Sequence, residues 1–324
     1  MITTELDPAL EALQRGELVA FPTETVYGLG ADATRSAAVR RVFAAKGRPV
    51  DHPLIVHVGS GATAGVRRST TEWLDVLEPW TVDPDPRAVG LAEAFWPGPL
   101  TLVMARSRLV SDAAVGGRST IGLRVPDHPM TLELLRRFGG GLVGPSANRF
   151  GHVSPTTADH VVDDLGDEVT IVLDGGPCRV GVESTIVEVL DGPVTLLRPG
   201  GVSHAQLVDV LNEEVVDGRS GPSRAAGMLA SHYAPNASVE VVTSAGEALV
   251  RGGSQRTSVV GPGGNFPLPT DAAGFAAGFY AALRRADAPG IAKIFVVPPT
   301  SGELLDAVLD RLRKAAGPRS VGSR

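Results

Sequence analysis

The chain has 324 residues, 43% of them hydrophobic and 20% charged, which are ordinary values for a globular protein long enough to form two domains. Its formal net charge of -6 argues against a protein whose main role is to coat nucleic acid, although a local basic cleft is allowed. The single cysteine, Cys178, excludes an internal disulfide and a multi-cysteine zinc site, and we expect a small buried hydrophobe.

The first seven residues lack the cationic start and apolar run of a signal peptide, and no stretch has the length of a membrane span. A lone thiol also suits a reducing compartment. We therefore expect a cytoplasmic protein with no membrane partner.

The first part of the chain predicts a mixed α/β domain. A helix begins at Asp7, a strand follows at 18–21, and a second helix runs from Ser36 to Lys46, where Gly47 breaks it. Further strands are predicted at 54–58, 100–104, 121–125, 170–173, 184–189 and 194–197, and further helices at 127–138, 157–165 and 203–211.

Beyond Pro235 the pattern changes to strands that alternate with helices. The strands are predicted at 239–242, 258–260 and 292–297, and the helices at 245–251, 271–286 and 301–316. This alternation indicates a small parallel sheet with crossover helices. The predicted domains are 1–205 and 237–317, joined by a linker at 206–236 and followed by a frayed tail at 318–324.

Several common site signatures are absent. There is no phosphate-binding loop of the G-x-x-x-x-G-K-[ST] type, and Gly28 and Gly30 lack the third glycine of a dinucleotide fingerprint. His52 and His57 flank an apolar strand with no nearby Cys or Glu to complete a metal site. Residues 144–148 resemble a nucleophile elbow only superficially, because the final glycine is missing. We expect neither a metal held by protein alone nor serine hydrolase chemistry.

Four cations stand at the ends of predicted elements. Lys46 and Arg48 flank a glycine, Arg124 ends a strand, and Arg198 precedes the Pro-Gly-Gly turn. Taken one at a time, each is most simply a solvated surface charge. Together they offer a way to hold a triphosphate without a glycine-rich cradle.

Seven motifs occur in a fixed order along the chain: FPTETVYGLG at 21–30, KGRP at 46–49, PLIVH at 53–57, WPGPLT at 96–101, PSAN at 145–148, GVESTI at 181–186 and LRPG at 197–200. In this order they resemble the YrdC-type threonylcarbamoyl-AMP synthases. The later segment His232-Tyr233-Ala234-Pro235 resembles the linker signature of the two-domain form. The resemblance therefore covers nearly the whole chain.

The resemblance implies an N-terminal YrdC-like twisted mixed sheet with helices and a smaller C-terminal Rossmann-like parallel α/β domain. It implies a nucleotidyltransferase in which L-threonine captures bicarbonate or carbon dioxide, and the carbamate attacks the α-phosphate of ATP to give threonylcarbamoyl-AMP and pyrophosphate. The product would serve N6-threonylcarbamoyladenosine formation in tRNAs reading codons that start with A, through a downstream threonylcarbamoyl transferase. Such chemistry needs positioning and charge neutralisation rather than a nucleophilic side chain.

By motif position, the resemblance assigns three groups of residues. The catalytic pair facing the phosphates is Lys46 and Arg48. The residues expected to contact ATP are Arg48, His52, Thr120, Ser146, Asn148, Ser154, Arg198 and Tyr233. Those expected to contact L-threonine are Thr25, His57, Arg124, Gly144 and Ser184, with Arg124 facing the carboxylate. Mg²⁺ would arrive on the phosphate oxygens of ATP.

Two other functions stay open at this point. The first is a non-catalytic RNA-binding module, which would use many basic and aromatic residues, whereas aromatics are only 5% here. The second is a carbamoyltransferase-like domain of hydrogenase maturation, which would need additional regions that this chain has no room for. A weak contact with tRNA is compatible with the enzyme. The second domain carries no charged cluster assigned to chemistry, and a regulatory or lid role is the hypothesis for it.

Overall fold

The computed structural model describes residues 1–59, 61, 68–219, 233–253 and 255–317. The predicted frayed tail and residues 220–232 of the predicted linker lie outside the described residues. Within the described ranges, no helix is both long and apolar enough to cross a membrane.

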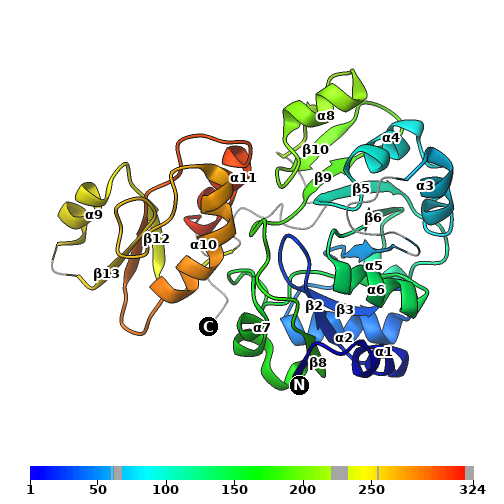
Figure 1. Ribbon diagram of the computed structural model, residues 1–324, viewed down its shortest axis with the longest axis horizontal. Helices are drawn as coiled ribbons and strands as arrows, with labels where there is room; N and C mark the ends of the chain where they lie inside the picture. Colours follow the sequence, from blue (N-terminus) through cyan, green and yellow to red (C-terminus); the bar gives the residue numbers. More distant parts are fainter. Residues whose placement is uncertain (60, 62–67, 220–232, 254, 318–324) are drawn as a thin grey trace.

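A mixed sheet of eleven strands occupies the first two thirds of the chain (Figure 1). The strands are β1 (Ile2–Thr3), β2 (Val19–Phe21), β3 (Gly28–Asp32), β4 (Ile55–His57), β5 (Leu100–Ala105), β6 (Thr120–Arg124), β7 (Leu142–Val143), β8 (Ile171–Leu173), β9 (Thr185–Glu188), β10 (Thr195–Arg198) and β11 (Val216–Asp217). Their order is β1-β8-β2-β3-β7-β4-β6-β5-β9-β10-β11. Parallel pairs such as β4 with β6 alternate with antiparallel pairs such as β5 with β6. The predicted twisted mixed sheet is thereby confirmed.

Helices cover this sheet mainly on the side away from the second domain (Figure 1). They are α1 (Leu6–Arg15), α2 (Ser36–Lys46), α3 (Thr70–Leu77), α4 (Pro86–Phe95), α5 (Asp112–Val115), α6 (Pro129–Phe138), α7 (Ala158–Leu165) and α8 (His204–Leu211), with a 3-10 turn, η1, at Gly166–Glu168. Helix α2 buries Val39, Val42 and Phe43, as its apolar spacing predicts. Gly47 ends it in the left-handed conformation with φ 61°, which confirms the predicted break.

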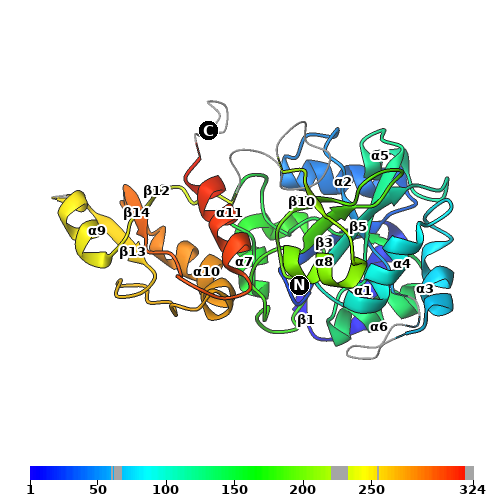
Figure 2. The ribbon, with the colours of Figure 1, turned by 90° about the horizontal axis from the view of Figure 1, so that it is seen from above.

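The second domain is a parallel three-stranded sheet connected by helices, as predicted. Its strands are β12 (Ser238–Val241), β13 (Thr257–Val260) and β14 (Lys293–Val296), in the order β12-β14-β13. Its helices are α9 (Ala245–Gly252), α10 (Ala272–Ala286) and α11 (Leu305–Ala315), so the last helix begins four residues later than expected. Figures 1 and 2 show α10 and α11 on the side of this sheet that faces the first domain.

The stretch from 206 to 219, placed in the predicted linker, belongs structurally to the first domain. Most of α8 lies in it and packs against α4. Strand β11 adds to the edge of the first sheet by parallel pairing of Val216 with Thr195. A two-residue strand among acidic and glycine residues carries no alternation that the sequence pattern could reveal.

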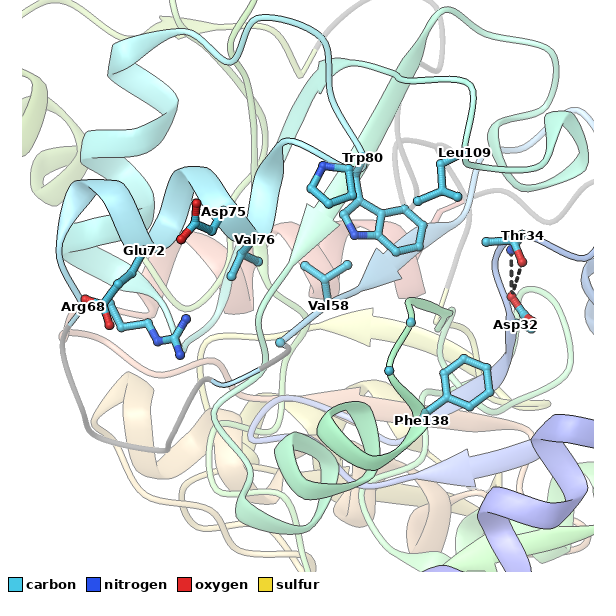
Figure 3. A pocket seen from close by; sticks show the side chains of 14 residues that line it. Asp32, Thr34, Val58, Arg68, Glu72, Asp75, Val76, Trp80, Leu109 and Phe138 are labelled. Carbon is cyan, nitrogen blue, oxygen red and sulfur yellow. Dashed lines mark hydrogen bonds between the residues drawn. The ribbon is translucent and has the colours of Figure 1, made fainter.

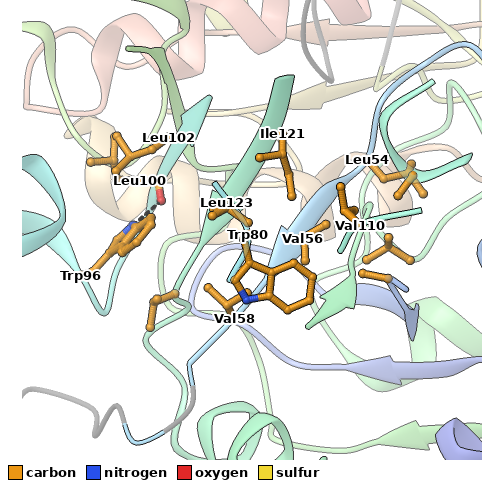
Figure 4. Close-up of a cluster of buried hydrophobic side chains, with 14 of the residues drawn as sticks. Leu54, Val56, Val58, Trp80, Trp96, Leu100, Leu102, Val110, Ile121 and Leu123 are labelled. Atoms are coloured by element: carbon orange, nitrogen blue, oxygen red, sulfur yellow. Dashed lines mark hydrogen bonds between the residues drawn. The ribbon is translucent and has the colours of Figure 1, made fainter. Parts of the chain in front are cut away.

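A large hydrophobic core lies between the first sheet and its helices (Figure 4). Trp96 is buried there and donates its indole N–H to the carbonyl oxygen of Leu100 at 2.7 Å. Cys178 belongs to the same core, and burial raises the pKa of its thiol to about 12, in agreement with the expected buried hydrophobe.

The core of the second domain continues into the first. Phe275 and Phe279 of α10 belong to one buried cluster with Val26, Val153 and Val182 of the first domain. The two domains therefore meet through a continuous apolar interface, and the segments that carry these three valines also carry predicted site residues.

Candidate active site

A cavity of about 50 Å³ lies at the ends of β4, β6, β7 and β10. Eight predicted site residues line it together: Arg48, His57, Arg124, Gly144, Ser146, Ser184, Arg198 and Tyr233. The remaining lining residues are Val26, Pro53, Leu54, Ile55, Pro145 and Glu183. Residues that are as far apart in the sequence as Arg48 and Tyr233 thus line the same cavity.

Arg124 forms one end of the cavity and is almost fully enclosed. Its guanidinium forms an ion pair with Glu24 at 2.8 Å and donates to the Thr25 hydroxyl at 2.8 Å. A third bond goes to the carbonyl oxygen of Gly98 at 3.3 Å. Thr25 therefore lies behind Arg124 and orients it, rather than lining the cavity itself. A guanidinium fixed in this way is suited to bind a carboxylate.

His57 lies beside Arg124, because the two residues pair in register between the parallel strands β4 and β6. Burial, with a contribution from the charge of Arg124, lowers the pKa of His57 well below its ordinary value, so the ring is neutral. Its Nδ1 has no hydrogen-bond partner among the described residues. A Cβ at Gly144 would lie 2.5 Å from this nitrogen, which is too close for two non-bonded atoms. Glycine at this position therefore allows the backbone of residue 144 to lie against the His57 ring.

Arg48 and Arg198 supply positive charge along the wall formed by Ser146, Ser184 and Tyr233. Burial is the main cause that lowers the pKa of each arginine, and their mutual repulsion lowers that of Arg48 further, to about 10. Arg198 is anchored by bonds to the carbonyl oxygen and hydroxyl of Ser184, at 3.0 and 3.1 Å. Two buried cations that repel each other favour an anion between or beside them.

Five predicted residues other than Thr25 lie outside the cavity lining: Lys46, His52, Thr120, Asn148 and Ser154. The Lys46 ammonium donates to the carbonyl oxygens of Ser146 and Asn148, and therefore holds the turn that carries Ser146. Thr120 begins β6, four residues before Arg124, which corresponds to about 13 Å along a strand.

His52 and Ser154 contact neighbours of the cavity. The His52 ring lies edge-to-face against Phe150, with ring centroids 5.7 Å apart, and the Arg48 guanidinium lies 5.6 Å from the centre of the Phe150 ring. The Ser154 hydroxyl donates to Glu183 at 2.6 Å. His52 thus contacts Phe150, which lies against the cavity residue Arg48, and Ser154 contacts the cavity residue Glu183 directly.

Two acidic residues of the site were not among those predicted, although both lie within the seven motifs. Glu24 pairs with Arg124, and Glu183 lines the cavity directly. The available signal was that each is the one charged residue of its motif, and a charged residue must be paired when it is buried. Their partners could not be deduced, because pairing across the fold leaves no pattern in the sequence.

Tyr233 closes the cavity from the side of the second domain. Its backbone φ of 63° is rare for a residue other than glycine, and its side chain is buried. The ring stacks on Tyr280 with a centroid separation of 5.9 Å, and the guanidinium of Arg311 lies 5.2 Å from its centre. Helices α10 and α11 therefore hold the wall that Tyr233 forms.

A larger groove of about 710 Å³ lies elsewhere on the first domain (Figure 3). Two of its acidic residues are engaged in local bonds: Asp32 accepts bonds from the backbone and hydroxyl of Thr34, and Glu72 closes the capping box of α3 with Ser69. None of its lining residues was predicted to bind a substrate. The smaller cavity is therefore the candidate site. No described group of three or more His, Cys, Asp or Glu side chains is placed to hold a metal ion.

Two family models match this chain in succession. Residues 11–200 match a model described as Telomere recombination, which covers the Sua5, YciO and YrdC proteins. Residues 202–317 match a model described as Threonylcarbamoyl-AMP synthase, C-terminal domain. The first match covers most of the eleven-stranded sheet, and the second begins before α8 and includes β11 together with the whole second domain.

Individual relatives extend over nearly the whole chain. The threonylcarbamoyl-AMP synthase of Pyrococcus abyssi is 38% identical over 95% of this chain and 93% of its own length. That of Bacillus subtilis is 36% identical over 98% of this chain and 94% of its own length. The crystal structure of P. abyssi Sua5 with L-threonine superposes with a TM-score of 0.86 at 36% identity, covering 96% of this chain and 94% of that one. The chain therefore belongs to the threonylcarbamoyl-AMP synthase family, in the form that carries a C-terminal domain.

Proposed function

We propose that this protein is an L-threonylcarbamoyladenylate synthase, which converts L-threonine, bicarbonate or carbon dioxide, and ATP into threonylcarbamoyl-AMP and pyrophosphate. The observation that carries the proposal is the convergence of eight motif residues around one cavity, with a fixed guanidinium at Arg124 and two buried cations at Arg48 and Arg198. A structure of the archaeal relative holds L-threonine, which supports the amino acid as substrate.

We assign the threonine end of the site to Arg124 and His57. Arg124 binds the carboxylate of threonine, and Glu24 and Thr25 hold the guanidinium in place. A neutral His57 offers an acceptor to the amino group or hydroxyl of the substrate. The amino group then captures carbon dioxide, and the resulting carbamate points toward the cations.

We assign the nucleotide end to Arg48 and Arg198, with Ser146 and Ser184 as further donors. The two guanidiniums neutralise the phosphates as the carbamate oxygen attacks the α-phosphorus and pyrophosphate leaves. Lys46 holds the turn that presents Ser146, and Thr120 and Asn148 are assigned to the nucleoside part. Mg²⁺ on the phosphate oxygens would supply additional charge neutralisation.

The cavity must enlarge to admit ATP, since pockets for ligands of this size have volumes of about 300–1,000 Å³. Its present volume is about 50 Å³. We further propose that the protein acts in the cytoplasm and passes its product to a threonylcarbamoyl transferase acting on tRNA.

The test is mass analysis of the nucleotide product formed from ATP, Mg²⁺, L-threonine and ¹³C-bicarbonate, with L-serine in place of threonine as control. We expect an AMP adduct that contains both threonine and the heavy carbon. Absence of any adduct, together with tight binding of RNA without ATP, would favour the RNA-binding module instead.

A further inference from the structure

Glu183 faces the cavity but is bound largely by the second domain. Its carboxylate accepts bonds from the Tyr280 hydroxyl at 3.0 Å and from Nε of Arg311 at 2.7 Å. The only first-domain side chain bonded to it, among the described residues, is Ser154 at 2.6 Å. Helices α10 and α11 thus both bind the carboxylate of Glu183 at the edge of the candidate active site.

This carboxylate is ionised. Burial by itself would raise the pKa of Glu183, but the charge of Arg311, then that of Arg198, and the hydrogen bonds from Arg311 and Ser154 outweigh burial and lower it to about 2. A negative charge at the wall of a site for a triphosphate is unfavourable. Like charges repel more strongly in a buried site than in water, because the effective dielectric constant there is lower.

The second domain supplies Arg311, whose positive charge cancels the negative charge of Glu183. Arg311 is fully buried, pairs with Glu183 and Asp310, and leaves Nη2 without a hydrogen-bond partner among the described residues. Asp310 has its own cation, because the Lys314 ammonium lies 2.7 Å from it. The four charges therefore cancel, and without Arg311 the cluster would be left with one excess negative charge beside Arg198.

We propose that Arg311 is a positioning residue supplied by the C-terminal domain, which neutralises Glu183 so that Arg198 and the cavity can accept the anionic nucleotide. The proposal rests on ATP as the ligand of this site, as inferred above. It gives the C-terminal domain a specific electrostatic role at a site built by the first domain. Removal of Arg311 would leave Glu183 to repel phosphate and to compete for Arg198.

The experiment measures the dissociation constant of MgATP by calorimetry on the full-length chain. We expect Arg311→Met to weaken MgATP binding at least tenfold, whereas Arg311→Lys, which keeps the charge, stays within about threefold of the unmodified protein. The double variant Arg311→Met with Glu183→Gln is expected to recover affinity to within about threefold. If Arg311 served only to dock the two domains, the additional change Glu183→Gln would not restore MgATP affinity, because it removes a further charged partner from the interface.

Arg284→Met is the matched control. Arg284 of α10 also pairs across the domain interface, with Asp164 of α7 at 2.6 Å, and among the described residues it forms no ion pair with Glu183. Its loss should leave MgATP affinity within about threefold. An equal loss in Arg284→Met and Arg311→Met, or failure of Glu183→Gln to rescue, would overturn the proposal.

Glu183→Gln alone keeps the test decisive if Arg311→Met does not fold. It removes the negative charge and should bind MgATP as tightly as the unmodified protein or more tightly, while a tenfold loss would refute charge compensation. Because binding is measured without turnover, these results are independent of whether threonylcarbamoyl-AMP is made. Absence of the adduct with normal MgATP binding would instead contradict the proposed function.

Discussion

At the scale of single residues, Lys46 and Arg48 stand two positions apart in the same motif but have different surroundings. Lys46 is buried against the carbonyl oxygens of Ser146 and Asn148, whereas Arg48 lines the cavity and donates to the carbonyl oxygen of Pro53 at 3.2 Å. The motif predicted both as site residues. Their different positions could not be predicted, because these depend on a turn a hundred residues away.

Replacing Lys46 and Arg48 by methionine, one at a time, should separate a structural role of Lys46 from a binding role of Arg48. Lys46→Met leaves two buried carbonyls without their donor and should lower the free energy of unfolding by about 2–4 kcal/mol, with loss of activity. Arg48→Met should cost about 1 kcal/mol or less in stability but reduce kcat on the order of 100-fold. Urea denaturation and initial rates measure both effects. Equal losses of stability in the two variants would contradict the assignment.

Arg124 gives the second prediction. Arg124→Ala should raise KM for L-threonine about 10- to 100-fold and change KM for ATP by less than about threefold, since a bond between ions contributes about 1.5–3 kcal/mol. The variant also leaves buried Glu24 without its cation. Adding Glu24→Gln should restore stability but not threonine affinity, and recovery of both would show that Arg124 only serves the fold.

Glu183 predicts a dependence of stability on pH. Its pKa is lowered from 4.5 to about 2 in the folded protein, so the associated stability is fully present above pH 4.5 and is lost as the pH falls toward 2. This shift corresponds to about 3 kcal/mol. Denaturation of the unmodified protein and of Glu183→Gln at pH 7, 4.5 and 3 should show the two proteins converging as the pH falls. A constant difference between them would contradict the assigned shift.

At the scale of elements, helices and strands with clear apolar periodicity could be predicted, and those that depend on partners could not. Strand β3 contains Gly28 and Gly30, which have low strand propensity. A Cβ at either position would lie 2.9 Å from the Phe21 ring, so the glycines are needed for that ring to pack on the hairpin. Helix α3 did carry a readable signal, the capping box of Ser69 and Glu72, and could have been predicted.

The loop before Glu183 gives the prediction at this scale. Gly181 has φ 77°, and a Cβ there would lie 2.2 Å from the carbonyl oxygen of Ala276 in α10. Gly181→Ala should therefore push α10 away from the first domain, increase hydrogen exchange in α10 and lower activity at least tenfold. Gly176 is the matched control, since its φ is 79° and a Cβ would meet nothing within 4 Å. Equal effects in the two variants would mean that backbone strain, rather than contact with α10, is responsible.

At the scale of the whole molecule, the motif order predicted a mixed sheet followed by a parallel α/β domain, and both are observed. The contribution of the second domain to the site could not be predicted. Tyr280 lies on a mainly apolar helix and Arg311 on a helix rich in charged residues, and their bonds to Glu183 join residues 97 and 128 positions apart. Such contacts follow from how the domains pack and have no local pattern.

The most direct test of the whole account is pyrophosphate release by the purified full-length protein with ATP, Mg²⁺ and bicarbonate, measured with and without L-threonine. If the cavity between Arg124 and the cations Arg48 and Arg198 joins the two substrates, release depends on threonine and L-serine does not replace it. Release at the same rate without threonine, or no release with all substrates present, would contradict the account.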